Sequence, residues 1–60
     1  AIYEFIAAYH REHGYGPSMR EIADACGITS SSIVHGHIER LVADGMLRRT
    51  PGIARSYRPA

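Results

Sequence analysis

Residues 14–23 read GYGPSMREIA and hold the signals that end one helix and begin the next. Gly14 can adopt the left-handed conformation on which helices end, and Pro17 cannot continue a helix. Ser18 and Glu21 stand three residues apart, as in a capping box, where each side chain satisfies a free backbone amide of the other residue. The stretch therefore predicts one helix that ends near residue 13 and another that begins near residue 19.

Apolar residues on both sides of this stretch follow helical spacing. Before Gly14 they recur every three or four positions, which predicts a helix over about residues 2–13 whose apolar face holds Ile2, Phe5, Ile6 and Tyr9. The helix that starts near residue 19 is short and ends at Gly27, and its inward side chains are Ile22, Ala23 and Cys26. We expect Cys26 to be a small buried apolar residue rather than a nucleophile.

A third periodic segment follows a run of hydroxyl side chains. Residues 29–32 read TSSS and offer several possible N-caps. The apolar positions after them are spaced four, three and one apart, which predicts a helix over about residues 31–44 that is closed by Gly45. Its inward stripe holds Val34, Ile38, Leu41 and Val42.

The remaining residues are typical of a hairpin. Residues 46–50 and 53–58 are short extended runs separated by the turn dipeptide Pro51-Gly52. Earlier in the chain, Ala23 and Gly27 have the small-residue spacing of a helix-turn-helix. The order helix, helix, helix, strand, strand predicts a winged helix-turn-helix: one mainly α domain over residues 1–60 with a small β-hairpin. In that architecture the third helix enters the major groove of DNA and the wing follows the backbone.

Length and composition limit the possible functions. Sixty residues allow one domain with a thin core, so we expect a binding module rather than an enzyme, with no catalytic residues and no cofactor. The single cysteine cannot close an internal disulfide, which fits a reducing, cytoplasmic compartment. No apolar run approaches the roughly 20 residues that a membrane span needs. The first residue is alanine, so we expect the chain to be a fragment of a longer protein.

Charge is distributed unevenly along the chain. Residues 1–30 carry four acidic side chains and two arginines, a net charge of −2, whereas residues 31–60 carry five arginines and two acidic side chains, a net charge of +3. All seven basic residues are arginines, whose planar fork suits phosphates and guanine edges. The positive half of the chain therefore favours a polyanionic partner.

The sequence resembles the DNA-binding domain of the LexA repressor family. Residues 14–23 match its G-x-x-P-[ST]-x-x-E-I-A signature, residues 37–41 followed by Gly45 resemble the end of its third helix, and Gly52 with residues 55–58 resembles its wing. This resemblance implies an operator-reading domain of a bacterial or phage repressor of the DNA-damage (SOS) response, associated with the nucleoid. It also implies a homodimer formed through a C-terminal domain with a self-cleaving serine–lysine pair. Such a domain lies outside this chain, which contains no lysine.

The resemblance also implies which residues contact DNA. The positions where the family reads base edges hold Ser30, Ser32, Ile33, His35 and Gly36, all off the predicted inward stripe. This stretch departs from the asparagine and paired glutamates that are usual in the family. Contacts to the DNA backbone are predicted for Ser31 and for the arginines of the hairpin, which are Arg48, Arg49, Arg55 and Arg58.

Several alternatives remain open from the sequence. The serines cap the third helix, contact DNA or divide the two roles among them, and Gly36 is a tolerated surface glycine or permits close approach of DNA. The four histidines form no compact ligand set with Cys26, so we expect no metal site, and we place His37 at the edge of the core. Tyr57 is expected to fold from the wing onto the core. The alternative function is a winged-helix protein-interaction module that does not touch DNA, with its arginines simply solvated.

Overall fold

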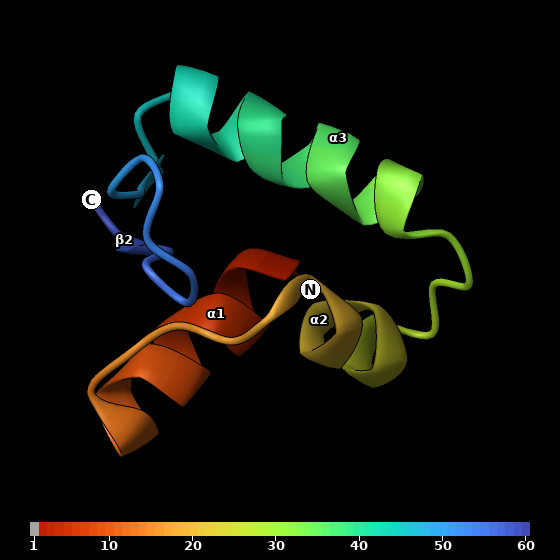
Figure 1. The fold of residues 1–60 in the computed structure, drawn as a ribbon, viewed down its shortest axis with the longest axis horizontal. Coiled ribbons are helices and arrows are strands. Elements are labelled where there is room, and N and C mark those ends of the chain that lie inside the picture. The colour runs from red at the N-terminus through yellow and green to blue at the C-terminus, as the bar shows by residue number, and fades with distance from the viewer. Residues whose placement is uncertain (1) are drawn as a thin grey trace.

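The computed structural model describes residues 2–60, which form three helices followed by an antiparallel pair of short strands (Figure 1). The elements are α1 (Ile2–His13), α2 (Met19–Cys26), α3 (Ser31–Ala43), β1 (Leu47–Arg48) and β2 (Arg58–Pro59). This confirms the winged helix-turn-helix and the predicted helices to within a residue. No helix in residues 2–60 is both long and apolar enough to span a membrane.

The capping box at the start of α2 is formed as the sequence predicted. The Ser18 hydroxyl accepts the backbone N–H of Glu21 at 3.1 Å, and the Ser18 N–H donates to the Glu21 carboxylate at 2.7 Å. At the other end of α2, Gly27 takes a left-handed conformation with φ 68°. The helix therefore begins and ends on local signals in its own sequence.

Four elements share one small core. Fully or nearly buried apolar side chains come from α1, α2, α3 and β1, and they are Ile6, Ile22, Ala23, Val34, Ile38 and Leu47. Tyr57 packs half-buried against them, as predicted for a wing residue folded back on the core. Cys26 is half-buried at the edge of the same cluster. Because Leu47 belongs to the core, the wing is joined to the helices at its base.

The strands of the wing are shorter than predicted. The ladder holds two residue pairs, Leu47 with Pro59 and Arg48 with Arg58, rather than strands over residues 46–50 and 53–58. The predicted Pro51-Gly52 turn is present, with Gly52 at φ 80°. A second turn follows at once and diverts the chain from the ladder before Arg58.

Arg55 lies in this second turn with φ 56°, a left-handed conformation that non-glycine residues seldom adopt. The loop is braced internally by Ser56, whose hydroxyl accepts the Thr50 N–H at 3.0 Å and donates to the Thr50 carbonyl at 3.2 Å. The two limbs of the loop are thus joined by a side chain where the predicted strands would have been joined by backbone bonds.

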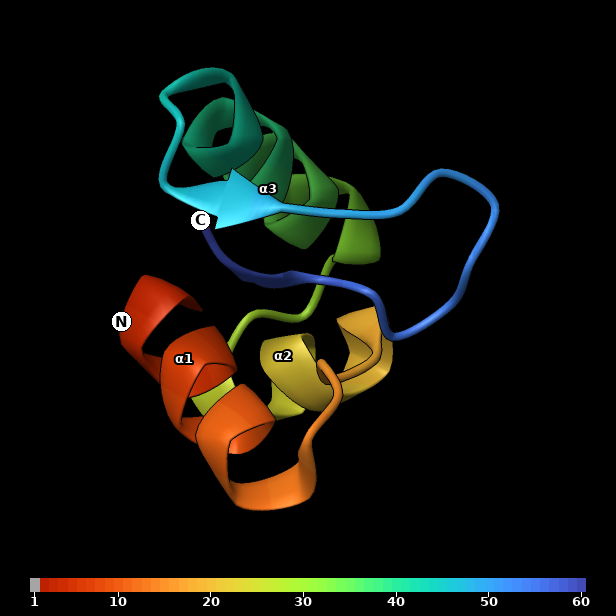
Figure 2. The same cartoon turned by 90° about the vertical axis from the view of Figure 1, so that its left-hand side faces the viewer.

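The loop of the wing returns to the linker between α1 and α2 (Figure 2). The Gly16 N–H donates to the Arg55 carbonyl at 2.8 Å. Gly16 is buried, and a Cβ added to it would overlap the Tyr57 carbonyl oxygen. Gly16 is therefore required for the close approach of two backbones, not for an unusual φ.

Three side chains from different elements meet beside this contact. The Arg55 guanidinium donates to the Glu21 carboxylate at 2.6 Å and to the Tyr9 hydroxyl at 3.0 Å. The Tyr9 hydroxyl in turn donates to the other Glu21 carboxylate oxygen at 3.2 Å. We call Tyr9, Glu21 and Arg55 the wing triad. It connects α1, α2 and the wing.

Replacing Gly16 by alanine tests the backbone approach. We expect Gly16→Ala to lower the free energy of unfolding by about 1–3 kcal/mol, the usual cost of forcing an extra methyl into a packed site. The matched control is Gly36→Ala, because a Cβ at Gly36 meets nothing within 4 Å. That control should raise stability by up to about 1 kcal/mol through helix propensity. Denaturant unfolding followed by circular dichroism measures both, and equal effects of the two substitutions would contradict the assignment.

The pH dependence of stability tests the bonds to Glu21. Its pKa is lowered from 4.5 to about 2, first by the N–H of Ser18 and then by the hydrogen bond from Arg55. A carboxylate with a lowered pKa in the folded state stabilises the fold fully above its unfolded pKa, and this contribution is lost as the pH falls through the folded pKa. We therefore expect the Tm of the wild type to fall more steeply than that of Glu21→Gln between pH 4.5 and about 2. Parallel Tm curves would show that Glu21 does not carry this linkage.

Candidate nucleic-acid interface

The outward face of α3 is formed by residues that precede and separate its two buried positions. Val34 and Ile38 are fully buried, whereas Ile33 has 54% of its surface exposed. Ser32, His35 and the glycine at position 36 are exposed on the same helix. The spacing of the buried positions thus leaves the predicted base-reading side chains from Ser32 onward accessible to a ligand.

The start of α3 carries a row of serines. Ser30 occupies the N-cap position in an extended conformation, yet its side chain makes no capping hydrogen bond within the described structure. Ser31 and Ser32 are exposed in the first turn. Between the two interpretations of the serine run, the geometry gives no support to capping by Ser30. The hydroxyl groups are left to bind water or a ligand.

A shallow hollow interrupts the outward face of α3. It is lined by Ile33, Gly36, His37 and Arg40, which are three or four residues apart and hence neighbours on one side of the helix. His37 is exposed, and it also borders a hollow with Ile28 and Leu41, which pack against the core, so it lies at the surface beside the core. His37 and Arg40 were not among the predicted contacts, although their helical spacing from Ile33 and Gly36 was a signal that could have found them.

Glu39 places an acidic group between α3 and the wing. Arg49 donates to its carboxylate at 2.6 Å, and the His35 ring nitrogen lies 3.8 Å from the same oxygen. All three side chains are partly exposed. The ion pair of Arg49 with Glu39 joins α3 to residues 48–50, which we call the outgoing limb of the wing. It also offsets the negative charge of Glu39 next to the candidate interface.

The four predicted wing arginines differ in their surroundings. Within residues 2–60, Arg48 is exposed and makes no side-chain hydrogen bond or ion pair. Arg58 is half-buried and donates to the Ser56 carbonyl at 2.9 Å. Arg49 forms an ion pair with Glu39 of α3, and Arg55 belongs to the wing triad. Of the four, Arg48 has the guanidinium that is free to contact a phosphate.

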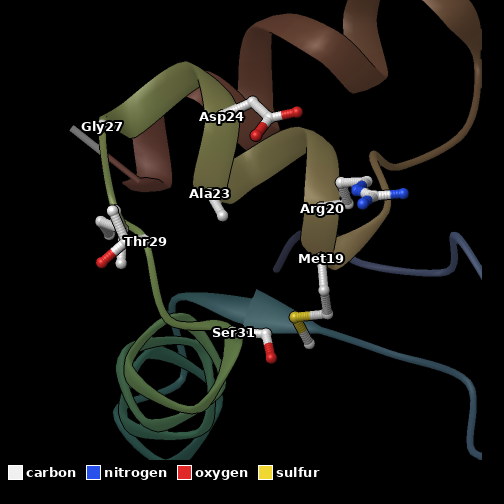
Figure 3. A pocket seen from close by; sticks show the side chains of 8 residues that line it. Met19, Arg20, Ala23, Asp24, Gly27, Thr29 and Ser31 are labelled. Carbon is white, nitrogen blue, oxygen red and sulfur yellow. The ribbon is translucent and has the colours of Figure 1, made fainter.

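A second hollow lies at the elbow between α2 and α3 (Figure 3). The small Ala23 side chain faces it from α2, and Ser31 borders it at the start of α3, with Met19 between the two helices. The small residue was predicted here because helix-turn-helix units bring two helices close together. Arg20 and Thr29 also line this hollow and were not among the predicted contacts.

No metal centre is found in the part of the chain that the structure describes. Residues 2–60 contain no group of three histidine, cysteine, aspartate or glutamate side chains placed to hold a metal ion. His35 lies near Glu39 at the helix surface, and Cys26 lies at the edge of the core with a free thiol.

Comparison with known proteins identifies the family. The sequence model described as "LexA DNA binding domain" matches residues 1–56. The LexA repressor of Listeria welshimeri is 56% identical over 50 residues, which cover 83% of this chain and 24% of that protein. The LexA repressor of Clostridium tetani is 55% identical over 51 residues, which cover 85% of this chain and 26% of that protein. The chain thus spans about a quarter of the length of these relatives. With its three helices and wing, it belongs to the LexA DNA-binding domain family.

Proposed function

We propose that this domain binds double-stranded DNA sequence-specifically, as the operator-reading domain of a LexA-type transcriptional repressor. The family match over nearly the whole chain carries this proposal. The structure adds an α3 whose first turns are exposed and whose N-cap serine makes no capping hydrogen bond within residues 2–60. A helix presented in this way on a helix-turn-helix frame fits the major groove of B-form DNA.

Base readout is assigned to the N-cap residue and the first two turns of α3. Ser30, Ser32 and His35 supply hydrogen-bonding groups for base edges, and Ile33 supplies an apolar surface for a thymine methyl group. Gly36 has no side chain at the centre of the exposed face, so the helix backbone can approach the DNA there. These small polar and apolar groups favour direct readout, through hydrogen bonds and apolar contacts to base edges.

Backbone contacts are assigned to residues that flank this face. Ser31 lies at the first turn of α3, while Arg48 and Arg49 lie on the outgoing limb of the wing and Arg58 on β2. These side chains would contact phosphates and fix the orientation of α3 without reading sequence. Arg55 belongs to the same set of predicted contacts, although its guanidinium is bonded to Glu21 and Tyr9.

In the full-length protein, we place this domain at one half-site of a two-fold symmetric operator. The relatives that the chain matches are more than three times its length, which leaves room for the C-terminal dimerisation domain that the resemblance implied. Joining two such domains raises the effective concentration of the second on DNA. The single domain, with a net charge of +1, is then expected to bind weakly alone. We also propose that the full-length protein regulates genes of the DNA-damage response.

Salt titrations separate backbone contacts from base contacts. The probes are a duplex selected from a random library by the wild-type domain and a scrambled duplex of the same composition. We expect Arg48→Gln to weaken binding to both duplexes alike and to reduce the slope of log K against log salt by about 0.9, the value for one phosphate contact. Ser32→Ala should weaken binding to the selected duplex alone. Fluorescence anisotropy measures both.

The control for Arg48→Gln is Arg11→Gln, an exposed arginine at the end of α1, outside the proposed interface. It should leave the slope unchanged. If the wild type binds both duplexes equally and without salt dependence, DNA binding fails and the protein-interaction module takes its place.

Gly36→Ala separates stability from binding. Because the added methyl group has open space in the free domain, the variant should be at least as stable as the wild type. On DNA, the same methyl group fills the hollow at the centre of the α3 face, and we expect affinity for the selected duplex to fall by about tenfold, or about 1.4 kcal/mol. Unchanged affinity would mean that Gly36 is a tolerated surface glycine. Thermal denaturation and anisotropy on the same samples measure both quantities.

A further inference from the structure

The wing triad closes a ring of hydrogen bonds between three elements. Arg55 donates to both other members, and the Tyr9 hydroxyl accepts from Arg55 while it donates to Glu21. The Arg55 guanidinium carbon also lies 5.7 Å from the centre of the Tyr15 ring, within the range of a cation–π contact. Every one of these partners belongs to α1, α2 or the linker between them, so the Arg55 side chain is drawn toward this side of the domain.

The backbone around Arg55 is held at the same place. Its carbonyl accepts the Gly16 N–H at 2.8 Å, and the Tyr57 carbonyl packs directly on Gly16. Arg55 also holds a left-handed φ of 56°, a conformation that persists where surrounding contacts enforce it. Side-chain and backbone contacts therefore both fix residues 55–57, which we call the returning limb of the wing, against the linker between α1 and α2.

The wing needs such support because its ladder is minimal. Two residue pairs cannot by themselves orient the long loop that joins β1 to β2. The outgoing limb is tied to α3 through Arg49 and Glu39. The returning limb is tied to α1 and α2 through the triad. With both limbs held, Arg48 and Arg58 keep a fixed position relative to α3.

We propose that Arg55 is a positioning residue that locks the wing onto α1 and α2 through Tyr9 and Glu21, rather than a phosphate contact. This inference rests on the proposed DNA-binding function, because the position of the wing matters for the backbone contacts of Arg48 and Arg58. The charge of Arg55 is directed at a carboxylate 2.6 Å away. A DNA phosphate would have to compete with the Glu21 carboxylate for the Arg55 guanidinium.

The two roles of Arg55 predict opposite effects of Glu21→Gln. If Arg55 contacted phosphate, removal of the competing carboxylate would strengthen DNA binding. If Arg55 positions the wing, the same substitution loosens the returning limb and weakens binding. Glutamine is also suited to the third helical position of a capping box, so the start of α2 is retained. The sign of the change therefore discriminates between the roles.

The experiment measures affinity for the selected duplex by anisotropy for the wild type, Glu21→Gln, Arg55→Gln and the double variant. We expect each single variant to bind roughly three- to tenfold more weakly, the size of losing about one ordinary hydrogen bond. The double variant should bind no more weakly than Arg55→Gln alone, because both substitutions remove the same interaction between Arg55 and Glu21. Tyr9→Phe, which removes only a hydroxyl group, should weaken binding in the same direction.

Two controls exclude trivial explanations. Glu12→Gln removes one negative charge from an exposed position on α1 and should leave binding unchanged or slightly stronger. Amide hydrogen exchange of Gly16 in the free variants reports whether the returning limb has been released, while exchange at the Ile38 amide reports on global unfolding. A larger acceleration of exchange at Gly16 than at Ile38 is the expected pattern for Glu21→Gln and Arg55→Gln, because loss of the Glu21 bonds also lowers the global stability.

The proposal is overturned if Glu21→Gln binds as tightly as the wild type or more tightly. It is also overturned if Arg55→Gln lowers the salt slope by one phosphate contact while Gly16 exchange is unchanged. Failure of the proposed function has a different signature, since the wild type would then not distinguish the selected duplex from the scrambled one. In that case Gly16 exchange in the free domain still decides whether the triad holds the wing.

Discussion

The Glu21 carboxylate is the group on which the arrangement of this domain depends. One of its oxygens accepts the Ser18 N–H and an Arg55 N–H, and the other accepts the Tyr9 hydroxyl. The same side chain thus caps the N-terminus of α2, accepts a hydrogen bond from α1 and fixes the returning limb of the wing. Two of these partners, Tyr9 and Arg55, are 12 and 34 residues away in the sequence. A local capping signal is here also a tertiary contact.

Polar contacts of this kind matter because the core is small. A chain of this size buries only about 60% of the surface that its unfolded form exposes, and six side chains form the buried cluster in residues 2–60. Those side chains fix the helices against one another, but Leu47 at the base is the one wing residue among them. Beyond Leu47, the path of the wing is set at the surface by the wing triad, by Arg49 with Glu39 and by Ser56 with Thr50.

This division explains what the sequence could predict. The helices were predictable because their limits are local: a capping box at Ser18, a left-handed glycine at position 27 and an apolar stripe through α3. The outward position of Ile33 followed from the same spacing. The second wing strand was predicted wrongly because an arginine at φ 56° gives no local signal and is held by Glu21, which is distant in the sequence. For the same reason the sequence could not separate the free guanidinium of Arg48 from those bonded to Glu39 and Glu21.

The pairing of arginines also changes the meaning of the charge distribution. The net charge of +3 on residues 31–60 already counts Glu39, which pairs with Arg49 at 2.6 Å, but not Glu21, which lies in the other half of the chain and pairs with Arg55 at 2.6 Å. Because Glu21 offsets the charge of Arg55 at short range, the field that α3 and the wing present to DNA is weaker than a net charge of +3 indicates. A weak field lowers the affinity for all sequences alike and leaves discrimination to the base contacts that we propose at the start of α3. Each domain alone binds weakly, and in the proposed dimer the joining of two domains raises the affinity for paired half-sites far more than the affinity for a single half-site. A modest positive charge on each domain therefore favours selectivity for the proposed two-fold symmetric operator.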